Sequence, residues 1–369
     1  MSEQPRSEQR VLLLIATTTG GTGRHVRVLV SALAERGWGV TVAGPRRTEE
    51  LFGFTETGAA FVPAEIGTRP SPESARALRI VRRLARDNDV VHAHSLRAGA
   101  IAALATPRTR PLVVTWHNAV LAQGNARTAY GLLERLVARR ATATLCVSSD
   151  LVDRVRELGG RDVQLAPVSA PAMPAPLRDR DAVRAELGVT DRPIVLSVGR
   201  LHAQKGFGDL VAAATRLSGH EPRPLFVIAG DGPARSDLER SIAEADAPVR
   251  LLGDRPDIPD LLHATDLMAL SSVWEGSPLA VSECLRAGVP FVGTAVGGVP
   301  DMVGDGGVLV PARDPAALAD AIQCVLDSPE LAEDLHTRAL RAATRLPTDA
   351  SVAEQVLATY SRVAGGDAQ

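Results

Sequence analysis

The sequence predicts an α/β protein of two domains, each built on a parallel sheet with helices between its strands. Three observations predict this class. Short apolar runs alternate with helix-length amphipathic segments throughout the chain, which is the pattern of strand–helix–strand units. The 369 residues exceed the length at which a single hydrophobic core stops growing. Residues 166–181 carry four prolines in their first eleven positions, which suits neither a sheet nor a helix and marks a domain boundary.

The apolar runs predict five strands in the first half and six in the second, and both sheets are expected to be Rossmann-like. The expected strands are 11–16, 39–43, 89–92, 112–115 and 143–147, followed by 194–198, 224–228, 249–252, 266–270, 290–293 and 307–309. We expect an N-terminal domain at 1–168 and a C-terminal domain at 169–346. Residues 347–369 are expected to form a last helix that crosses back to the N-terminal domain, with Val356 and Tyr360 on its apolar face.

The composition predicts a soluble globular protein, with 45% hydrophobic residues, 23% charged residues and a net charge of -2. Aromatic residues make up only 3%, which argues against stacking platforms for nucleic acid. The three cysteines are far apart and odd in number, so neither a disulfide framework nor a thiolate metal site is expected. The polar start, followed by six apolar residues, resembles neither a signal peptide nor a membrane span. A cytoplasmic protein is therefore expected, and its oligomeric state stays open.

The charge is unevenly distributed along the chain. Residues 1–168 carry a net charge of +8, and the remainder carries -10. Arg76, Arg79, Arg83 and Arg86 share one face of an expected helix in the basic half. That face is explained either by solvated arginines or by peripheral contact with the inner face of a membrane.

The first expected strand leads directly into Gly20 and Gly21 and then into a helix. A strand, a glycine turn and a helix in this order typically bind a phosphate. A dinucleotide loop would read G-x-G-x-x-G with an acidic residue about twenty positions later, but here Val26 stands at the third glycine position and the second expected strand is followed by Arg46 and Arg47. An NADP-dependent dehydrogenase that uses Arg46 or Arg47 remains an alternative. Otherwise the two glycines let backbone amides approach a phosphate that another domain holds.

The segment SVGRLHAQKG places Arg200 and Lys205 just beyond the carboxyl end of an expected strand, where ligands of parallel sheets bind. Lys205 is the only lysine among 41 basic residues, a bias typical of high-GC bacteria. Arginine offers a planar fork of donors and lysine a compact charge. Together they suit a diphosphate leaving group that gains negative charge as its bond breaks.

The segment WEGSPLAVSECLRAGVPFVG carries two glutamates with seven residues between them. Pro278 is expected in the first turn of a helix, which places Glu275 in the preceding loop and Glu283 inside the helix. The amides of residues 277–280 then form an anion site. Ionised carboxylates only accept hydrogen bonds, so Glu275 and Glu283 suit the hydroxyls of a sugar and the diol of a ribose.

Several motifs, taken together, carry a family resemblance. GGTGRHV, VVHAHS, SVGRLHAQKG, IAGDGP and EGSPLAVSECLRAGVPFVG, in this order, resemble the retaining glycosyltransferases of family GT4, including those of actinobacteria. The resemblance extends from about Val11 to about Asp314, and its combination of R-x4-K, G-D-G-P and E-x7-E is specific. It implies the GT-B fold, in which two Rossmann-like β/α/β domains face each other across a cleft. The first domain would bind the acceptor and the second the nucleotide sugar.

The resemblance implies roles for individual positions. Arg200 and Lys205 would hold the donor diphosphate. Glu275 would hold sugar hydroxyls at the reacting face, and Glu283 would bind the ribose. His117 matches the family histidine that approaches the transferred sugar. Further donor contacts are expected from Gly20, Gly21, Gly230, Gly232, Gly276, Ser277, Pro278 and Leu279.

The implied reaction moves a hexosyl or N-acetylhexosaminyl group, with retention, from a nucleoside diphosphate sugar to an acceptor hydroxyl. A UDP-sugar is favoured and GDP-mannose is possible. Ser277 and Asp301 depart from the family pattern in loops that read the donor sugar and base, so the resemblance does not fix the donor. His25 and Asn118 are the expected acceptor-binding residues. The acceptor could be a small metabolite, a lipid or a glycan. No cofactor and no metal are expected, since the cationic pair and a helix N-terminus already supply positive potential.

Other interpretations stay open. His92, His94 and His117 could be metal ligands, because alternate strand positions share one face, but no carboxylate completes the set. Asp87-Asn88-Asp89 is interpreted as a turn rather than a metal motif. Cys284 is expected to be a core residue. A sugar-nucleotide 2-epimerase of the same fold would convert the donor without an acceptor, and a non-catalytic paralogue would bind the nucleotide sugar without turnover.

Overall fold

The computed structural model describes residues 9–67, 72–121, 124–170 and 173–365. Contacts divide the chain into two compact units, which are described separately. Unit 1 comprises Met1–Ser169 with Pro347–Gln369, and unit 2 comprises Ala170–Leu346. Among the described residues, no helix has both the length and the apolar character needed to cross a membrane.

Unit 1 is built on a parallel sheet of seven strands in the order β3-β2-β1-β4-β5-β6-β7. The strands are β1 Arg10–Ile15, β2 Gly39–Gly44, β3 Ala60–Pro63, β4 Val90–His94, β5 Leu112–Trp116, β6 Ala143–Cys146 and β7 Val163–Leu165. The helices are α1 Gly21–Ala34, α2 Arg46–Phe52, the 3-10 turn η1 Thr55–Thr57, α3 Pro72–Leu84, α4 Leu96–Ala105, α5 Gly124–Arg140, α6 Ser149–Glu157 and α15 Asp349–Ala364.

Five of these strands were expected from the sequence, whereas the two edge strands β3 and β7 were missed. Both are short and only partly buried, so neither shows the continuous apolar run of the central strands. The basic helix is also shorter than expected. Helix α3 ends at Leu84, so Arg86 lies in the following turn rather than on the arginine face.

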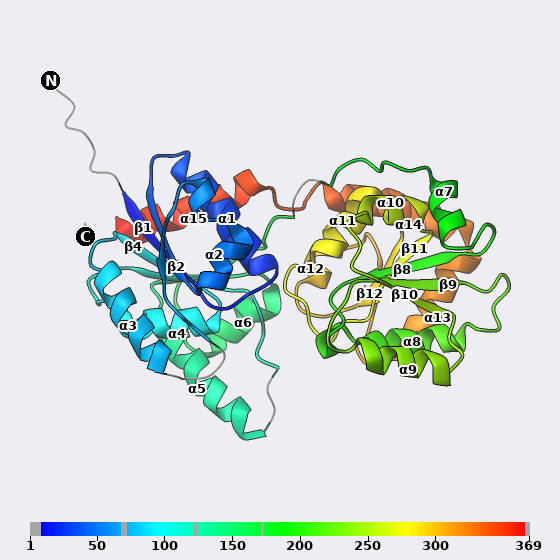
Figure 1. Ribbon diagram of the computed structural model, residues 1–369, viewed down its shortest axis with the longest axis horizontal. Helices are drawn as coiled ribbons and strands as arrows, with labels where there is room; N and C mark the ends of the chain where they lie inside the picture. Colours follow the sequence, from blue (N-terminus) through cyan, green and yellow to red (C-terminus); the bar gives the residue numbers. More distant parts are fainter. Residues whose placement is uncertain (1–8, 68–71, 122–123, 171–172, 366–369) are drawn as a thin grey trace. The chain divides into compact units, whose positions relative to one another are not determined.

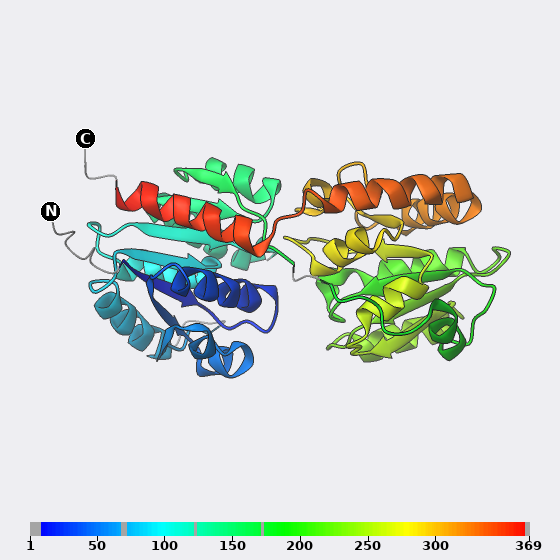
Figure 2. The ribbon, with the colours of Figure 1, turned by 90° about the horizontal axis from the view of Figure 1, so that it is seen from above.

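Helices α1 and α15 cover the same face of the sheet in unit 1, and they contact each other. Figure 1 shows both on one side of the strands, with α3, α4 and α5 on the other. In Figure 2 the final helix α15, in red, runs along this unit. Tyr360 of α15 is fully buried in the same cluster as Leu13 of β1 and Val113 of β5. The last helix is thus part of the core of unit 1.

Unit 2 is a parallel sheet of six strands in the order β10-β9-β8-β11-β12-β13, and each strand lies where the sequence predicted one. The strands are β8 Ile194–Val198, β9 Leu225–Ala229, β10 Val249–Gly253, β11 Leu267–Leu270, β12 Phe291–Thr294 and β13 Val308–Val310. The helices are α7 Arg180–Glu186, the 3-10 turn η2 Ala203–Lys205, α8 Phe207–Arg216, α9 Arg235–Glu244, α10 Ile258–Ala264, α11 Leu279–Ala287, α12 Val299–Val303, α13 Pro315–Asp327 and α14 Pro329–Ala343.

The sheet of unit 2 has an apolar cluster on each face. Helices α8, α9 and α13 cover one face, and α7, α10, α11 and α14 cover the other, as Figure 1 shows. Alternate residues of a strand serve opposite clusters: Val195 of β8 packs with the first group of helices and Leu196 with the second. The structure therefore confirms two parallel α/β sheets, each covered on both faces.

Candidate active site

The centre of the site in unit 2 is an ion pair between Lys205 and Glu275. Lys205 Nζ lies 2.7 Å from Glu275 Oε1, and the Ser272 hydroxyl donates to the same oxygen at 2.5 Å. The side chain of Glu275 is only 8% exposed and that of Lys205 21% exposed, so the pair is largely shielded from water. A carboxylate held by two donors has a fixed direction and keeps its second oxygen for another hydrogen bond.

Strand order explains why these residues meet although 70 positions separate them. Strands β8 and β11 are parallel neighbours, so the loops that follow them lie at the same edge of the sheet. The loop after β8 ends in η2, which carries Lys205, and the loop after β11 carries Ser272 and Glu275. Two backbone-anchored bonds join the loops: the Val273 amide donates to the Gln204 carbonyl at 2.8 Å, and the Gln204 side chain donates to the Trp274 carbonyl at 2.9 Å.

The glycines of the G-D-G-P segment support the loop after β8. Gly230 has a φ of +142°, and a Cβ built on it would lie 2.1 Å from the Gly199 carbonyl oxygen. A Cβ on Gly232 would lie 2.4 Å from the Leu201 carbonyl oxygen. The Leu201 amide also donates to the Asp231 carbonyl at 2.9 Å. Only glycine permits this approach, so both glycines shape the loop that carries the cationic residues.

The segment before α11 holds the backbone of Glu275 in place. The Gly298 amide donates to the Glu275 carbonyl at 3.0 Å. Pro278 lies at the N-cap rather than inside the first turn, so α11 begins one residue later than the sequence suggested. The first amides of this nine-residue helix point out of its N-terminus, beside buried Gly276 and half-buried Ser277.

Glu283 lies in the second turn of α11 and is half-buried. Leu279, the first residue of the helix, is likewise half-buried. Arg200 is exposed two residues beyond the end of β8. The two motifs therefore meet at the carboxyl end of one sheet, as the sequence predicted for a ligand site. The ion pair and the bond from Ser272 were not predicted, because motif spacing does not show which residues pair.

The glycine turn of unit 1 opens onto free space. Gly20 is the N-cap of α1, both Gly20 and Gly21 are exposed, and a Cβ on either would meet no atom within 4 Å. Gly23, which the sequence reasoning did not single out, is the sterically required glycine. A Cβ on it would lie 2.1 Å from the ring of Phe52 in α2. The absence of a side chain at Gly23 thus allows α1 to pack against α2.

Three histidines of unit 1 form a buried cluster beside this turn. His25 comes from the second turn of α1, His94 from the end of β4 and His117 from the residue after β5. They are 6%, 0% and 8% exposed. His94 Nδ1 lies 3.2 Å from His117 Nε2. His25 was expected at the acceptor and His117 at the transferred sugar, and their rings lie 5.1 Å apart.

The environment of the cluster keeps its imidazoles neutral. Burial lowers the pKa of His25 to about 4, and burial together with the neighbouring histidines lowers the pKa values of His94 and His117 well below the usual value. Neutral imidazole has one N–H donor and one acceptor nitrogen. Asn118, expected beside the acceptor, is exposed immediately after the cluster.

His92 does not join these three histidines as the sequence alternative proposed. Its Nδ1 lies 2.7 Å from the Tyr360 hydroxyl and its Nε2 lies 2.7 Å from the Thr115 hydroxyl. Both ring nitrogens are thus occupied by groups from α15 and β5. The set of His92, His94 and His117 is therefore wrong as a ligand set, and His25 takes the place of His92.

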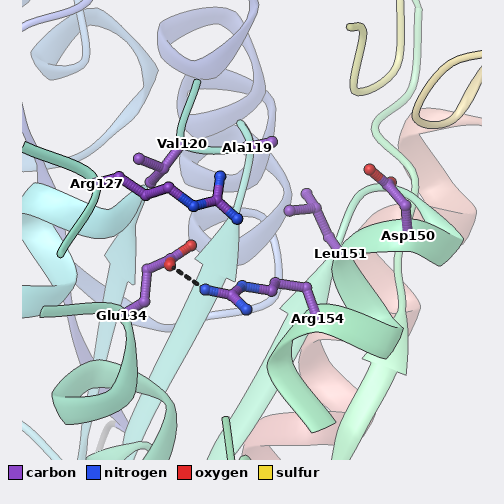
Figure 3. Close-up of a pocket in the computed structure, with 7 residues that line it drawn as sticks. All are labelled: Ala119, Val120, Arg127, Glu134, Asp150, Leu151 and Arg154. Atoms are coloured by element: carbon purple, nitrogen blue, oxygen red, sulfur yellow. Dashed lines mark hydrogen bonds and ion pairs between the residues drawn. The ribbon is translucent and has the colours of Figure 1, made fainter. Parts of the chain in front are cut away.

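Unit 1 also has a polar pocket of about 230 Å³ next to the loop that follows β5. Its lining comes from that loop and from α5 and α6: Ala119, Val120, Arg127, Glu134, Asp150, Leu151 and Arg154. Figure 3 shows Arg127 and Glu134 pointing into the same space, and Glu134 accepting a hydrogen bond from Arg154 at 2.8 Å. The pocket therefore offers both a carboxylate and guanidinium groups next to Asn118.

Comparisons with known proteins agree with both units. Residues 20–171 match the family described as glycosyl transferase 4-like domain, and residues 179–341 match the family described as glycosyl transferases group 1. The chain is 34% identical over 325 residues to alpha-D-kanosaminyltransferase of Streptomyces kanamyceticus, which covers 79% of this chain and 78% of that one. It is 32% identical over 324 residues to D-inositol 3-phosphate glycosyltransferase of Nocardia farcinica, covering 80% and 72%.

A structural comparison gives the same fold. The crystal structure of HepE from Anabaena in complex with UDP superposes with a TM-score of 0.80 at 20% identity, covering 96% of this chain and all of that one. The named relatives share glycosyl transfer and differ in the group transferred or in the acceptor. Two matched families, relatives above 30% identity and two Rossmann-like sheets with the R-x4-K and E-x7-E motifs lead to one conclusion: the chain belongs to the GT4-type glycosyltransferases of the GT-B fold.

Proposed function

We propose that this glycosyltransferase moves a hexosyl or N-acetylhexosaminyl group from a UDP-sugar to an acceptor hydroxyl with retention of anomeric configuration. The observation that carries the proposal is the Lys205–Glu275 pair at the carboxyl end of the sheet in unit 2, with Arg200 and Glu283 at the same edge. HepE, which shares the fold, has been crystallised with UDP and with UDP-glucose. A UDP-sugar is therefore favoured, and GDP-mannose is the alternative donor.

The contacts of Lys205 and Glu275 suit the roles proposed for them. An ammonium group has three N–H donors, so Lys205 can keep its bond to Glu275 and still donate to a diphosphate oxygen. Glu275 uses Oε1 for Lys205 and Ser272, which leaves Oε2 to accept from a sugar hydroxyl. Arg200 would share the diphosphate and Glu283 the ribose. Gly20, Gly21 and His117 of unit 1 remain predicted donor contacts.

The proposed chemical step needs no covalent intermediate. The bond between the anomeric carbon and the diphosphate oxygen breaks, and the acceptor oxygen bonds to the same face of that carbon. The nucleoside diphosphate leaves with both electrons of the broken bond. The acceptor proton passes to its departing phosphate. Arg200 and Lys205 would stabilise the charge that develops on it. Retention by this route requires attack from the side of the leaving group.

Unit 1 is proposed to bind the acceptor, with His25 and Asn118 among its contacts. The pocket lined by Arg127 and Glu134 adjoins Asn118, and it has donors and acceptors for a polar acceptor group. One relative is named for the group it transfers and another for its acceptor, so their names do not give the acceptor of this chain, and a small metabolite, a lipid and a glycan all remain candidates.

A thermal-shift titration tests the donor. The purified chain would be titrated with UDP, GDP, ADP, TDP, their common sugars and NADP, with magnesium and with a chelator. A ligand that binds the native state raises the unfolding temperature. We expect UDP and a UDP-sugar each to raise the unfolding temperature, and each shift should be the same with chelator as with magnesium. A shift with NADP and with none of the nucleoside diphosphates would overturn the proposal in favour of a dehydrogenase.

The stereochemistry is testable without the acceptor. Slow transfer of the sugar to water releases a free hexose, and its first-formed anomer can be read by rapid NMR before mutarotation. We expect an α-linked UDP-sugar to release the α-anomer. First formation of the β-anomer would rule out retention. Conversion of the nucleotide sugar to an epimer without acceptor would instead identify a 2-epimerase.

Peripheral membrane contact through unit 1 also remains a proposal. Arg76, Arg79 and Arg83 are exposed on α3. Co-sedimentation with phosphatidylserine vesicles, and its loss in an Arg76→Glu/Arg79→Glu/Arg83→Glu variant, would support it. Equal sedimentation of both proteins would contradict it.

A further inference from the structure

The three clustered histidines of unit 1 form a nearly equilateral triangle. The ring centres of His25 and His117 are 5.1 Å apart, and those of His94 lie 5.5 Å from both. One nitrogen from each ring lies within 4.8 Å of the other two. The three side chains come from a helix, a strand end and a loop start, and a packed core holds each of these elements.

These separations match a tetrahedral metal site. A Zn²⁺ ion about 2.0–2.1 Å from an imidazole nitrogen lies about 3.2 Å from the ring centre, and tetrahedral angles then separate ring centres by about 5.2 Å. The separations in unit 1 are 5.1–5.5 Å. Nitrogens bound to one such ion lie about 3.4 Å apart. The His94–His117 nitrogen pair is at 3.2 Å, and all three nitrogens lie within 4.8 Å of one another, so the rings would have to rotate to bring the His25 nitrogen to this separation.

The cluster also has buried nitrogens without a partner. Neither ring nitrogen of His25, nor Nε2 of His94, has a hydrogen-bond partner among the described residues. Both side chains are more than nine-tenths buried. Buried polar atoms are normally satisfied, so these unpaired nitrogens on two adjoining rings indicate a ligand at the cluster. A divalent cation bound by one nitrogen from each of the three rings would be such a ligand.

The neighbourhood restricts the site to three protein ligands. His92 packs against His94, but its two nitrogens are committed to Tyr360 and Thr115. The group offers three imidazoles and no carboxylate or thiolate. Three imidazoles at a four-coordinate ion leave the fourth position to a water molecule. Three histidines and one open position suit Zn²⁺ and related ions rather than Mg²⁺ or Ca²⁺.

We infer that His25, His94 and His117 bind a divalent transition metal of the Zn²⁺ class, with water as the fourth ligand. This site is separate from the proposed donor chemistry in unit 2 and does not depend on it. It bears on the proposed function because His117 is the residue proposed to approach the transferred sugar. A bound metal occupies that histidine, so the metal inhibits transfer rather than assisting it.

Cobalt is the probe, because tetrahedral Co²⁺ absorbs visible light strongly and octahedral Co²⁺ only weakly. The full chain, without a polyhistidine tag and stripped by chelator, is titrated with Co²⁺ and then with Zn²⁺ in equilibrium dialysis. We expect one Zn²⁺ per chain, an intense visible band with Co²⁺ and displacement of Co²⁺ by Zn²⁺. No stoichiometric binding, or a weak octahedral spectrum, would overturn the inference.

Variants assign the site. His25→Ala and His94→Ala should each weaken Zn²⁺ binding about a hundredfold or more, while His263→Ala, at an exposed position of α10, should bind as the wild type does. Circular dichroism checks the folding of each variant, and two separate ligand variants protect the test against failure of one to fold. Unchanged affinity in a folded ligand variant would overturn the inference. Because binding is measured without a nucleotide sugar, the result is independent of the transferase proposal.

Discussion

At the scale of single residues, the proposed donor site depends on Glu275 Oε1. That oxygen accepts from Lys205 and from Ser272, and both donors come from loops at one sheet edge. The backbone of Glu275 is packed closely as well. A Cβ on Gly297 would lie 1.8 Å from the Glu275 carbonyl oxygen, so only glycine fits beside it. Charge and direction are therefore set before a ligand arrives, which is the condition for electrostatic stabilisation of a leaving group.

Replacing the single lysine tests its role. Lys205→Ala removes a donor at the developing charge, so turnover should fall about a hundredfold or more. Donor turnover by the variant is compared with that of Arg216→Ala, a matched loss of an exposed cation at the end of α8. Near-normal turnover of Lys205→Ala, with unfolding temperatures unchanged, would contradict the proposed contact with the diphosphate.

The proposed ribose contact of Glu283 predicts a different defect. Hydrogen bonds to a charged group are worth about 1.5–3 kcal/mol, so Glu283→Ala should weaken UDP binding about tenfold or more. Turnover at saturating donor should change less, because the ribose does not react. Titration calorimetry measures the affinity, with Glu244→Ala on the exposed end of α9 as control. Equal UDP affinity in both variants argues against the ribose contact.

At the scale of elements, glycines set how closely the loops of unit 2 approach. Gly230→Ala places a methyl group 2.1 Å from the Gly199 carbonyl oxygen at a φ of +142°. We expect a loss of at least about 1–3 kcal/mol in unfolding free energy, together with weaker UDP binding. Gly208→Ala is the control, because Gly208 is an exposed residue of α8 and a Cβ on it meets no atom within 4 Å. Equal stability of the two variants would show that the loop adapts.

The contact between His220 and α13 predicts a pH dependence. His220 Nδ1 lies 2.9 Å from the Pro222 carbonyl oxygen and Nε2 lies 2.8 Å from Asp327. These acceptors raise the pKa of His220, Pro222 more than Asp327. Protonation is thus favoured in the folded state. The stabilisation is fully present below the unfolded pKa of about 6.5 and is lost as pH rises through the higher folded pKa.

Denaturant unfolding of His220→Asn checks this sign. The wild type should exceed the variant in stability by more at pH 5.5 than at pH 9. Replacing His220 by Asn in an Asp327→Asn background, where the negative charge at the acceptor is removed, should give a stability difference that depends less on pH. A difference that does not change between the two pH values would exclude a charged His220 in the native state.

Also at this scale, strand prediction succeeded for the central strands and for the partly buried edge strands β10 and β13, but it missed the edge strands β3 and β7. The central strands are continuous apolar runs because helices cover both faces of the sheet. Strands β3 and β7 are short and partly exposed; β3 ends in a proline, a residue more typical of loops than of strands, and β7 is a three-residue strand with a glutamine at its centre. The helix α3 also ended before its periodic pattern did. Periodicity therefore located the elements but did not fix their ends.

At the scale of the whole molecule, the chain returns to unit 1 after completing unit 2. Tyr360 of α15 is fully buried against Trp38, with ring centres 5.4 Å apart, and its hydroxyl lies 2.7 Å from His92 Nδ1. Stability of unit 1 thus depends on a segment that follows the whole of unit 2.

Removing this hydroxyl tests that dependence. Tyr360→Phe leaves a buried His92 nitrogen unpaired, which should lower the unfolding free energy by about 1–3 kcal/mol. Hydrogen exchange should accelerate in β4 and β5 and stay unchanged in unit 2. Tyr130→Phe, at the other tyrosine of the chain, which is half-buried, should lower the unfolding free energy only slightly. Loss of protection in unit 2, or none anywhere, would contradict the assignment of α15 to the core of unit 1.

The sequence by itself determined the two parallel sheets, the breaks between the elements and the glycosyltransferase motifs. These follow from local periodicity and from residue spacing within single loops, which a linear pattern records. Only the tertiary structure decided that Lys205 bonds to Glu275 across 70 positions, that His92 bonds to Tyr360, and that His25 completes a triangle with His94 and His117. Each of these contacts depends on which strands are neighbours and on the face that a helix covers. Because that order is set by the packing of the entire core, residues distant in sequence meet in ways that spacing does not record.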